Sequence, residues 1–138
     1  GNSNDRNRIN NNITMGRYYN GDINGKFWFA VQDSNCADRF GKKGYYNEFH
    51  EIDLICYSFE KEDLKGVTDE LKSIRKNMGD KYKMVKKFFE ANNGYNDTML
   101  TECGLTPHDV SEYADLLMGR QIRDSIKSIG RCEFEGEN

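Results

Sequence analysis

Hydrophobic and polar positions alternate early in the chain and predict a β-hairpin over residues 16–31. This segment holds five aromatic residues and two Asn-Gly pairs, and Asn-Gly is typical of tight hairpin turns. A turn at the second pair, residues 24–25, would place Gly21 opposite Trp28, whereas a turn at the first pair would shift the pairing. We favour the second pair, because it leaves residues 26–31 as an uninterrupted strand.

Two further segments are typical of strands. Apolar side chains fall on both faces of residues 45–59, which predicts one central strand covered on both sides near its end. In residues 131–135 apolar and charged positions alternate, so we expect a half-buried strand there. Between the hairpin and the central strand, Ser34 is expected to cap a short helical turn over residues 35–40.

Three segments have the period of an amphipathic helix. The first spans residues 60–78 and the second residues 80–91, and a glycine follows shortly after each. The third and longest helix is expected over residues 106–129, because Thr106 is a good N-cap and Pro107 suits the first helical position.

This order of elements predicts an α+β fold. We expect an antiparallel sheet of about four strands, formed by the N-terminal hairpin, the central strand and the C-terminal strand, with three or four helices on one face. A single domain is expected over residues 15–138. Residues 1–14 are rich in asparagine and lack an apolar period, so we expect a disordered tail.

Composition narrows the class of protein. Hydrophobic residues make up 36% of the chain and charged residues 31%, while 12% are aromatic and supply large core side chains. No apolar run approaches the roughly 20 residues that cross a bilayer, and no segment resembles a secretion signal. We therefore expect a soluble, cytoplasmic protein that makes no membrane contact.

The cysteines do not predict a metal site. The four cysteines are widely spaced, with no C-x-x-C pair and no adjacent histidine, so they lack the pattern of zinc ligands. We expect free thiols in structural positions, and the sequence predicts neither a metal nor a cofactor.

Charge is distributed unevenly along a chain whose formal net charge is −3. Residues 65–87 hold eight basic and three acidic side chains, whereas residues 97–138 hold nine acidic and four basic ones. The lysine-rich helices could bind nucleic acid, with aromatic rings of the hairpin stacking on bases. Because the pI is near 5.5, the sequence allows nucleic acid as a partner but does not favour it.

The aromatic hairpin and one histidine are candidates for ligand binding. Trp28, Tyr18 and Tyr19 would form a stacking surface if exposed and part of the core if buried, and the alternation of the segment favours the core. His50 lies among carboxylates and could act as a general base or metal ligand. A solvated strand residue is the plainer interpretation of His50.

A pair of arginines in the longest helix is the other candidate. Arg120 and Arg123 follow Gly119, which costs about 1 kcal/mol relative to alanine inside a helix and therefore needs a reason. Arginines beside such a glycine could bind a phosphate or a carboxylate bidentately. The favoured alternative is a close helix crossing in which the arginines pair with neighbouring acids.

No motif in the sequence specifies a reaction. The common motifs of phosphate-binding loops, dinucleotide sites, hydrolase nucleophiles and zinc proteases are all absent. Residues 16–32, 113–124 and 130–135 together resemble a group of small uncharacterised proteins from phages, large DNA viruses and marine metagenomes. The resemblance covers most of residues 15–135 and implies only an accessory or host-interaction role, with no activity or catalytic residue.

The sequence favours a non-enzymatic binding or protein-interaction module, whose partner contacts the aromatic hairpin or the helix around Arg120. One alternative is a small ligand-binding protein or enzyme with a pocket between sheet and helices, and another is nucleic-acid binding. A second copy of the chain is also a candidate partner, through an exposed sheet edge at residues 131–135.

Overall fold

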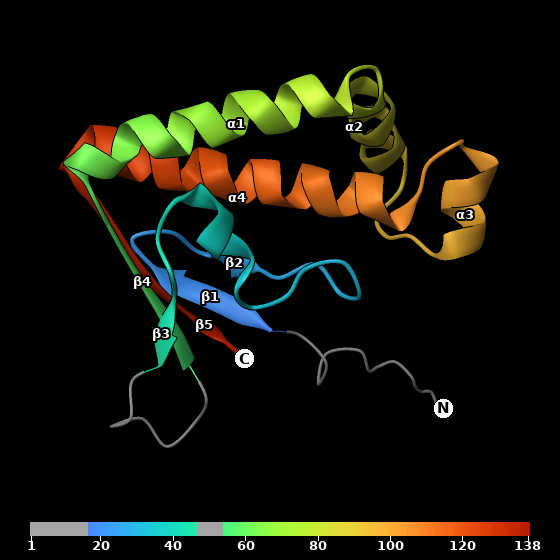
Figure 1. Ribbon diagram of the computed structural model, residues 1–138. Coiled ribbons are helices and arrows are strands. Elements are labelled where there is room, and N and C mark those ends of the chain that lie inside the picture. Colours follow the sequence, from blue (N-terminus) through green and yellow to red (C-terminus); the bar gives the residue numbers. More distant parts are fainter. Residues whose placement is uncertain (1–16, 47–53) are drawn as a thin grey trace, which may run out of the picture.

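A β-sheet with two long helices stacked on it makes up most of the computed structural model, which describes residues 17–46 and 54–138 (Figure 1). The sheet runs in the order β2-β1-β5-β4-β3, and every neighbouring pair is antiparallel. Its five strands are β1 (Tyr18–Gly21), β2 (Gly25–Lys26), β3 (Tyr45–Tyr46), β4 (Leu54–Glu60) and β5 (Arg131–Glu137). The predicted α+β class is confirmed, with five strands rather than about four.

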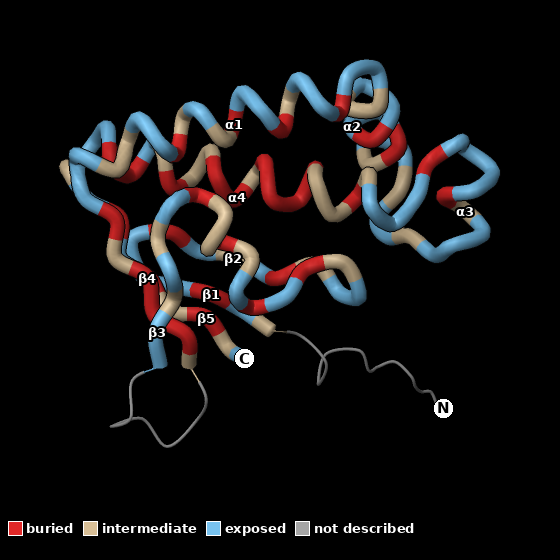
Figure 2. The backbone as a smooth tube through the Cα atoms, viewed as in Figure 1, coloured by how far each residue is buried: buried red, intermediate tan, exposed pale blue. Residues whose placement is uncertain are grey.

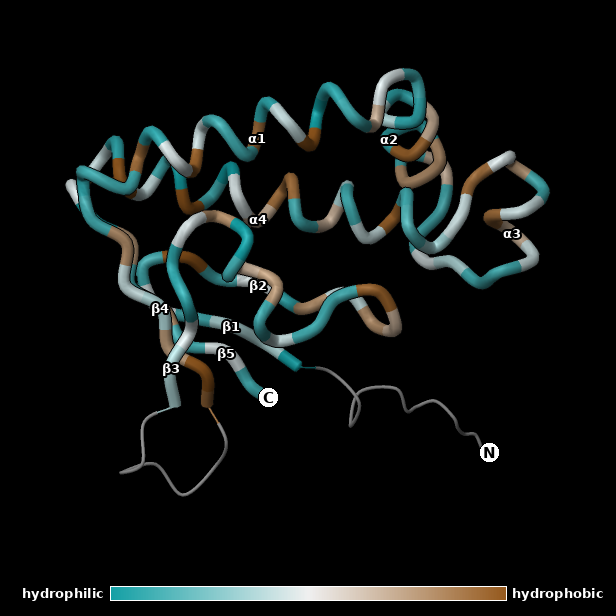
Figure 3. Tube along the Cα trace, in the orientation of Figure 1, coloured by the Kyte–Doolittle hydropathy of each residue, from teal (hydrophilic) through white to brown (hydrophobic). Residues whose placement is uncertain are grey.

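The helices lie on one face of the sheet and extend past its end (Figure 1). The α-helices are α1 (Leu64–Met78), α2 (Lys81–Ala91), α3 (Asp97–Glu102) and α4 (Pro107–Ile129), and two 3-10 turns are η2 (Cys36–Phe40) and η3 (Lys61–Asp63). Helix α4 lies between the sheet and α1, so it is buried along much of its length, whereas the outer side of α1 is exposed (Figure 2). The hydrophobic positions of α1 recur on the side that faces α4 (Figure 3).

The core lies between α4 and the two longest strands. On β4 the buried face carries Ile55, Tyr57 and Phe59, which is one of the two faces predicted from the alternation. The ring of Phe134 on β5 stacks on Tyr57, with ring centres 5.1 Å apart. The helical face of the sheet is thus held by ring contacts as well as by burial of apolar area.

Both ends of α4 follow from local sequence. The Thr106 hydroxyl accepts a hydrogen bond from the Asp109 backbone N–H at 3.2 Å, and the Asp109 carboxylate accepts one from the Thr106 N–H at 2.9 Å. Pro107 takes the first helical position, where no N–H is needed. The helix ends at Gly130, whose φ of +80° suits glycine.

The predicted register of the hairpin is wrong. Tyr18 pairs with Lys26 and Tyr19 with Gly25, so neither Asn-Gly pair forms a two-residue turn. Gly21 lies opposite Phe134 of β5 rather than opposite Trp28. The reason is that the end of β1 is bound to β5: the Asp22 N–H donates to the Glu133 carbonyl at 2.8 Å, so these residues cannot pair back onto β2.

Residues 26–31 do not form the strand that was predicted. After Lys26 the chain leaves the sheet, and the Gln32 backbone N–H donates to the Trp28 carbonyl at 3.0 Å in a turn. Alternation therefore fails here: Phe27 is buried, while Phe29 is 55% exposed.

Three other predictions need correction. Ser34 does not cap η2, because its hydroxyl donates to the Glu137 carbonyl at 2.7 Å, and η2 follows Asn35. The segment 45–59 is not one strand, since β3 pairs back onto β4. Residues 131–135 are not a sheet edge, because β5 lies between β1 and β4, so pairing with a second copy at this strand is excluded. The predicted tail, residues 1–14, lies outside the described residues.

Substituting Gly119→Ala tests the packing of α4. An added Cβ would lie 2.4 Å from Cζ of Phe40 and 2.6 Å from Cδ2 of Leu71, so we expect the free energy of unfolding to fall by about 1–3 kcal/mol. Urea unfolding measures this free energy. Gly66→Ala in α1 is the matched control, because its Cβ would meet nothing nearer than 3.9 Å, and it should stabilise by about 0.5–1 kcal/mol. Equal effects of the two substitutions would contradict this account.

Candidate functional site

A groove of about 390 Å³ runs along one flank of the contact between α1 and α4. Leu71 of α1 and Leu116 of α4 are both buried and line it as apolar residues. Its two sides lie close together because Gly119 has no side chain, so Leu71 can approach the backbone of α4. The close packing predicted at Gly119 is therefore observed.

Every other residue that lines the groove is basic. Lys72, Arg75 and Lys76 come from α1, where spacings of three and four place them on one side of the helix. Arg120 and Arg123 come from α4. The sequence candidates Arg120 and Arg123 thus face a second basic group from a distant segment, and the groove has no acidic lining residue.

Most of these cations have no acidic partner among the described residues. Arg123 pairs with Asp124 at 2.9 Å, whereas Lys72, Arg75, Lys76 and Arg120 form no ion pair with any residue in the described part of the chain. The expectation that both arginines pair with acids holds only for Arg123. Since like charges repel, five cations in one groove favour a negatively charged ligand.

The phenol of Tyr82 orders the arginines at one end of the groove. The Arg75 guanidinium lies over its ring, 4.0 Å from the ring centre. Nη1 of Arg120 donates a hydrogen bond to its hydroxyl at 3.3 Å. This hydrogen bond lowers the pKa of Tyr82, against the effect of burial, and the charges of Arg120, Lys86 and Arg75 lower it further. Positive charge therefore converges here from α1, α2 and α4.

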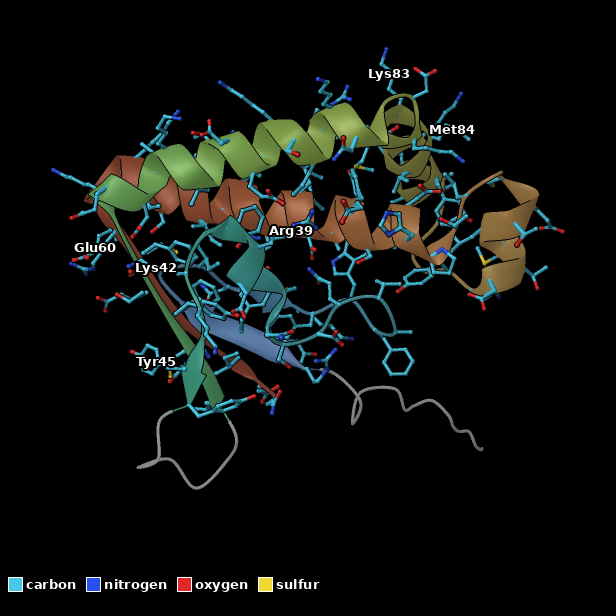
Figure 4. All side chains as sticks on the ribbon, viewed as in Figure 1. Arg39, Lys42, Tyr45, Glu60, Lys83 and Met84 are labelled. Carbon is cyan, nitrogen blue, oxygen red and sulfur yellow. The ribbon has the colours of Figure 1, made fainter. Side chains whose placement is uncertain are left out.

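Acidic residues of the same two helices are occupied elsewhere. The guanidinium of Arg39, which is labelled on η2 in Figure 4, contacts Glu70 at 2.8 Å, Glu112 at 2.6 Å and Asp115 at 2.7 Å. We call these four residues the Arg39 cluster. It ties η2 to both long helices, and none of its carboxylates lines the basic groove.

The Arg39 cluster continues into the loop after β2. Nε2 of Gln32 donates to Oδ1 of Asp115 at 2.8 Å, and its Oε1 accepts the Trp28 backbone N–H at 2.9 Å. Burial raises the pKa of the Asp115 carboxyl, and the hydrogen bonds from Gln32 and Arg39 offset this only in part. Burial lowers the pKa of Arg39, but its three carboxylate partners outweigh that effect and raise it.

The three aromatic candidates do not share a surface. Tyr19 is buried, and Trp28 is half-buried, with its ring edge-to-face against Phe89 at 4.9 Å. Tyr18 is 48% exposed, with the Lys26 ammonium 5.8 Å from its ring centre. Only Tyr18 is therefore free to contact a ligand, and the hairpin offers no continuous stacking platform.

The remaining candidates offer no catalytic grouping. His50 lies outside the described residues. All four cysteines are free, and burial raises the pKa of the Cys132 thiol to about 11, which makes it unreactive at neutral pH. Within residues 17–46 and 54–138, no three His, Cys, Asp or Glu side chains are arranged to hold a metal ion. No helix in those ranges is long and apolar enough to span a membrane.

The sequence pattern missed the partners of Arg120 and the role of Arg39. The basic excess over residues 65–87 was visible, but which lysines and arginines face α4 depends on the helix crossing. The spacing of Lys72, Arg75 and Lys76 was the local signal available. Arg39 lies in a short turn without a periodic pattern, so no local signal indicated its three partners.

No protein-family model, curated protein or solved structure matches this chain. The resemblance of residues 16–32, 113–124 and 130–135 to viral and metagenomic proteins therefore stays a prediction. A functional inference rests on the geometry of the described residues.

The Arg39 cluster predicts a pH-dependent loss of stability in Arg39→Met. Removing the cation leaves three carboxylates without their partner, so we expect destabilisation of roughly 2–3 kcal/mol at about pH 7, between the values for exposed and buried ion pairs. Without Arg39 the pKa of Asp115 rises further, so the folded variant takes up protons at a higher pH than its unfolded chain does. The deficit relative to wild type should therefore shrink as pH falls towards about 4.

Urea unfolding across that pH range measures this deficit. Lys42→Met is the control, because it removes one positive charge whose only ion pair among the described residues is with Asp63 at 3.4 Å, and it should cost less than about 1 kcal/mol. A deficit for Arg39→Met that does not change with pH would show that the carboxylates are not the cause.

Proposed function

We propose that this protein is a non-enzymatic binding module that holds the phosphate backbone of a nucleic acid in the basic groove between α1 and α4. The observation that carries the proposal is the lining of that groove: five basic side chains from two helices, two leucines and no carboxylate. Arginine guanidinium groups bind phosphate oxygens bidentately, and lysines add charge without demanding one geometry.

The same lining argues for binding rather than catalysis. Lysine and arginine are protonated at neutral pH, so none of the five can act as a general base or nucleophile without a lowered pKa. Leucine side chains provide neither a base nor a nucleophile. The groove can therefore hold an anion, but it offers no group to react with one.

A linear anion fits this shape better than a small one. The groove is open and follows two helices. Contacts to a phosphate backbone fix the position of the nucleic acid without reading its bases, so we expect little sequence preference. The half-buried Trp28 and buried Tyr19 are not available for base stacking.

The net charge of −3 does not oppose this proposal, because no acidic residue lines the groove. Cys132, Phe134 and Gly136 of β5 are buried, so the alternating residues Glu133 and Glu137 belong to the opposite face of the sheet. Charges separated by more than about 10 Å are largely screened at physiological salt, so a ligand in the groove experiences mainly the local cations.

The double substitution Lys72→Gln with Lys76→Gln tests the proposal. Both side chains are exposed, so the fold should be kept. We expect about tenfold weaker binding of fluorescein-labelled oligothymidylate at low salt, measured by anisotropy, and a salt slope reduced by about 2, because each lysine lost removes one phosphate contact.

Lys83→Gln with Lys127→Gln is the matched control, because it changes net charge equally outside the groove lining. It should reduce affinity much less. Equal losses in the two double variants would assign binding to overall charge. No binding of wild type in about 50 mM salt would overturn the proposal, and tighter binding of an oligoglutamate of equal charge would replace nucleic acid by an acidic protein.

A further inference from the structure

A second concave site lies away from the basic groove, between the loop after β2 and the segment that leads into α3. It encloses about 540 Å³, within the range of small-molecule pockets. Phe29, Ala30 and Tyr95 form its apolar wall, and Lys26, Asn96 and Asp97 are polar residues of its lining. It shares no residue with the basic groove, so an inference drawn from it is independent of the function proposed above.

The wall of this pocket is held in a strained conformation. Ala30 has a φ of +69°, and it is the single residue other than glycine with a positive φ in the described part of the chain. Such a conformation is unfavourable for a residue with a Cβ. The Tyr95 hydroxyl donates a hydrogen bond to the Phe29 carbonyl, which ties the two segments together beside Ala30.

One result of this conformation is an exposed aromatic ring. Phe29 is 55% exposed, although the rings on either side of it in the sequence turn inward: Phe27 is buried, and Trp28 packs on Phe89. Strained backbone and an exposed apolar ring each cost free energy, and the two occur together at one pocket. A ligand that covers the ring would remove the second of these costs.

The polar lining indicates the charge of that ligand. Lys26 forms no ion pair with any residue in the described ranges, and its ammonium lies over the Tyr18 ring, 5.8 Å from the ring centre. Oδ1 of Asn96 accepts the Met99 N–H at 2.8 Å, so its NH₂ group is left as a donor. Asp97 is the opposing charge, and its carboxylate lies near enough to Tyr95 to raise the pKa of that phenol, after the larger effect of burial.

We propose that this pocket binds a small aromatic carboxylate. The ligand ring lies against Phe29 and Tyr95, and its carboxylate faces Lys26. The cation attracts the ligand and Asp97 repels it, so the two side chains set the affinity in opposite directions.

Titration of the ¹⁵N-labelled protein with phenylacetate tests the proposal by NMR. We expect saturable shifts confined to residues 26–30 and 94–98, with a Kd of about 1 mM for a ligand this small. Benzylamine, which has the ring but the opposite charge, should bind at least about fivefold more weakly, and acetate, which lacks the ring, should not saturate.

Three variants separate ring from charge. Lys26→Met should weaken phenylacetate binding and Asp97→Asn should strengthen it, each by about two- to fivefold, while Lys43→Met, an equal charge change in an exposed loop, should have no effect. Phe29→Ala should abolish saturation, and since Phe29 is largely exposed, the variant should fold.

Absence of saturable shifts with wild type would overturn the proposal. So would equal binding of benzylamine and phenylacetate, or equal affinities of the Lys26→Met and Asp97→Asn variants. The oligothymidylate assay tests residues of the basic groove, and the phenylacetate titration tests residues of this pocket. One proposal can therefore be rejected while the other is supported.

Discussion

The close approach of η2, α1 and α4 at Gly119 is the constraint on which the rest of the molecule depends. A side chain at that position would collide with Phe40 and Leu71, which are the residues that fill the space between the three elements. Because interiors are packed at the density of organic crystals, a helix displaced here would displace both walls of the basic groove. The separation of Arg75 and Arg120, which share one phenol, is therefore set by a glycine that does not itself line the groove.

The Arg39 cluster solves an electrostatic problem created by that packing. Bringing α1 and α4 together also brings Glu70, Glu112 and Asp115 together, and three carboxylates in a partly buried site would repel one another. Arg39 satisfies all three from η2, and Gln32 completes the hydrogen bonding of Asp115. These acids are thereby held by a partner of their own, and every charged residue that lines the groove between the two helices is a cation.

Elements with local signals were predictable from the sequence, and those that depend on tertiary contacts were not. The ends of α4 are defined by Thr106, Pro107 and Gly130, whose signals act within a few residues. The helix therefore begins and ends where the sequence pattern predicts. The hairpin register failed because Asp22 bonds to Glu133, more than a hundred positions away, and no turn rule contains that partner. The groove was half predictable: Arg120 and Arg123 were visible beside Gly119, but their facing cations required the crossing of α1 and α4.

Composition describes the average charge of the chain and not the charge around the groove. A net charge of −3 is a property of the whole chain, whereas a ligand responds to the potential within about one Debye length. In this fold the alternation of β5 sends Glu133 and Glu137 to one face of the sheet, while α1 and α4 lie on the other. Around the groove, the acids of α1 and α4 either pair with Arg39 or lie outside the groove lining, so the local charge there is positive. The groove lining therefore carries a charge opposite in sign to the net charge of the chain, which an average over the sequence cannot reveal.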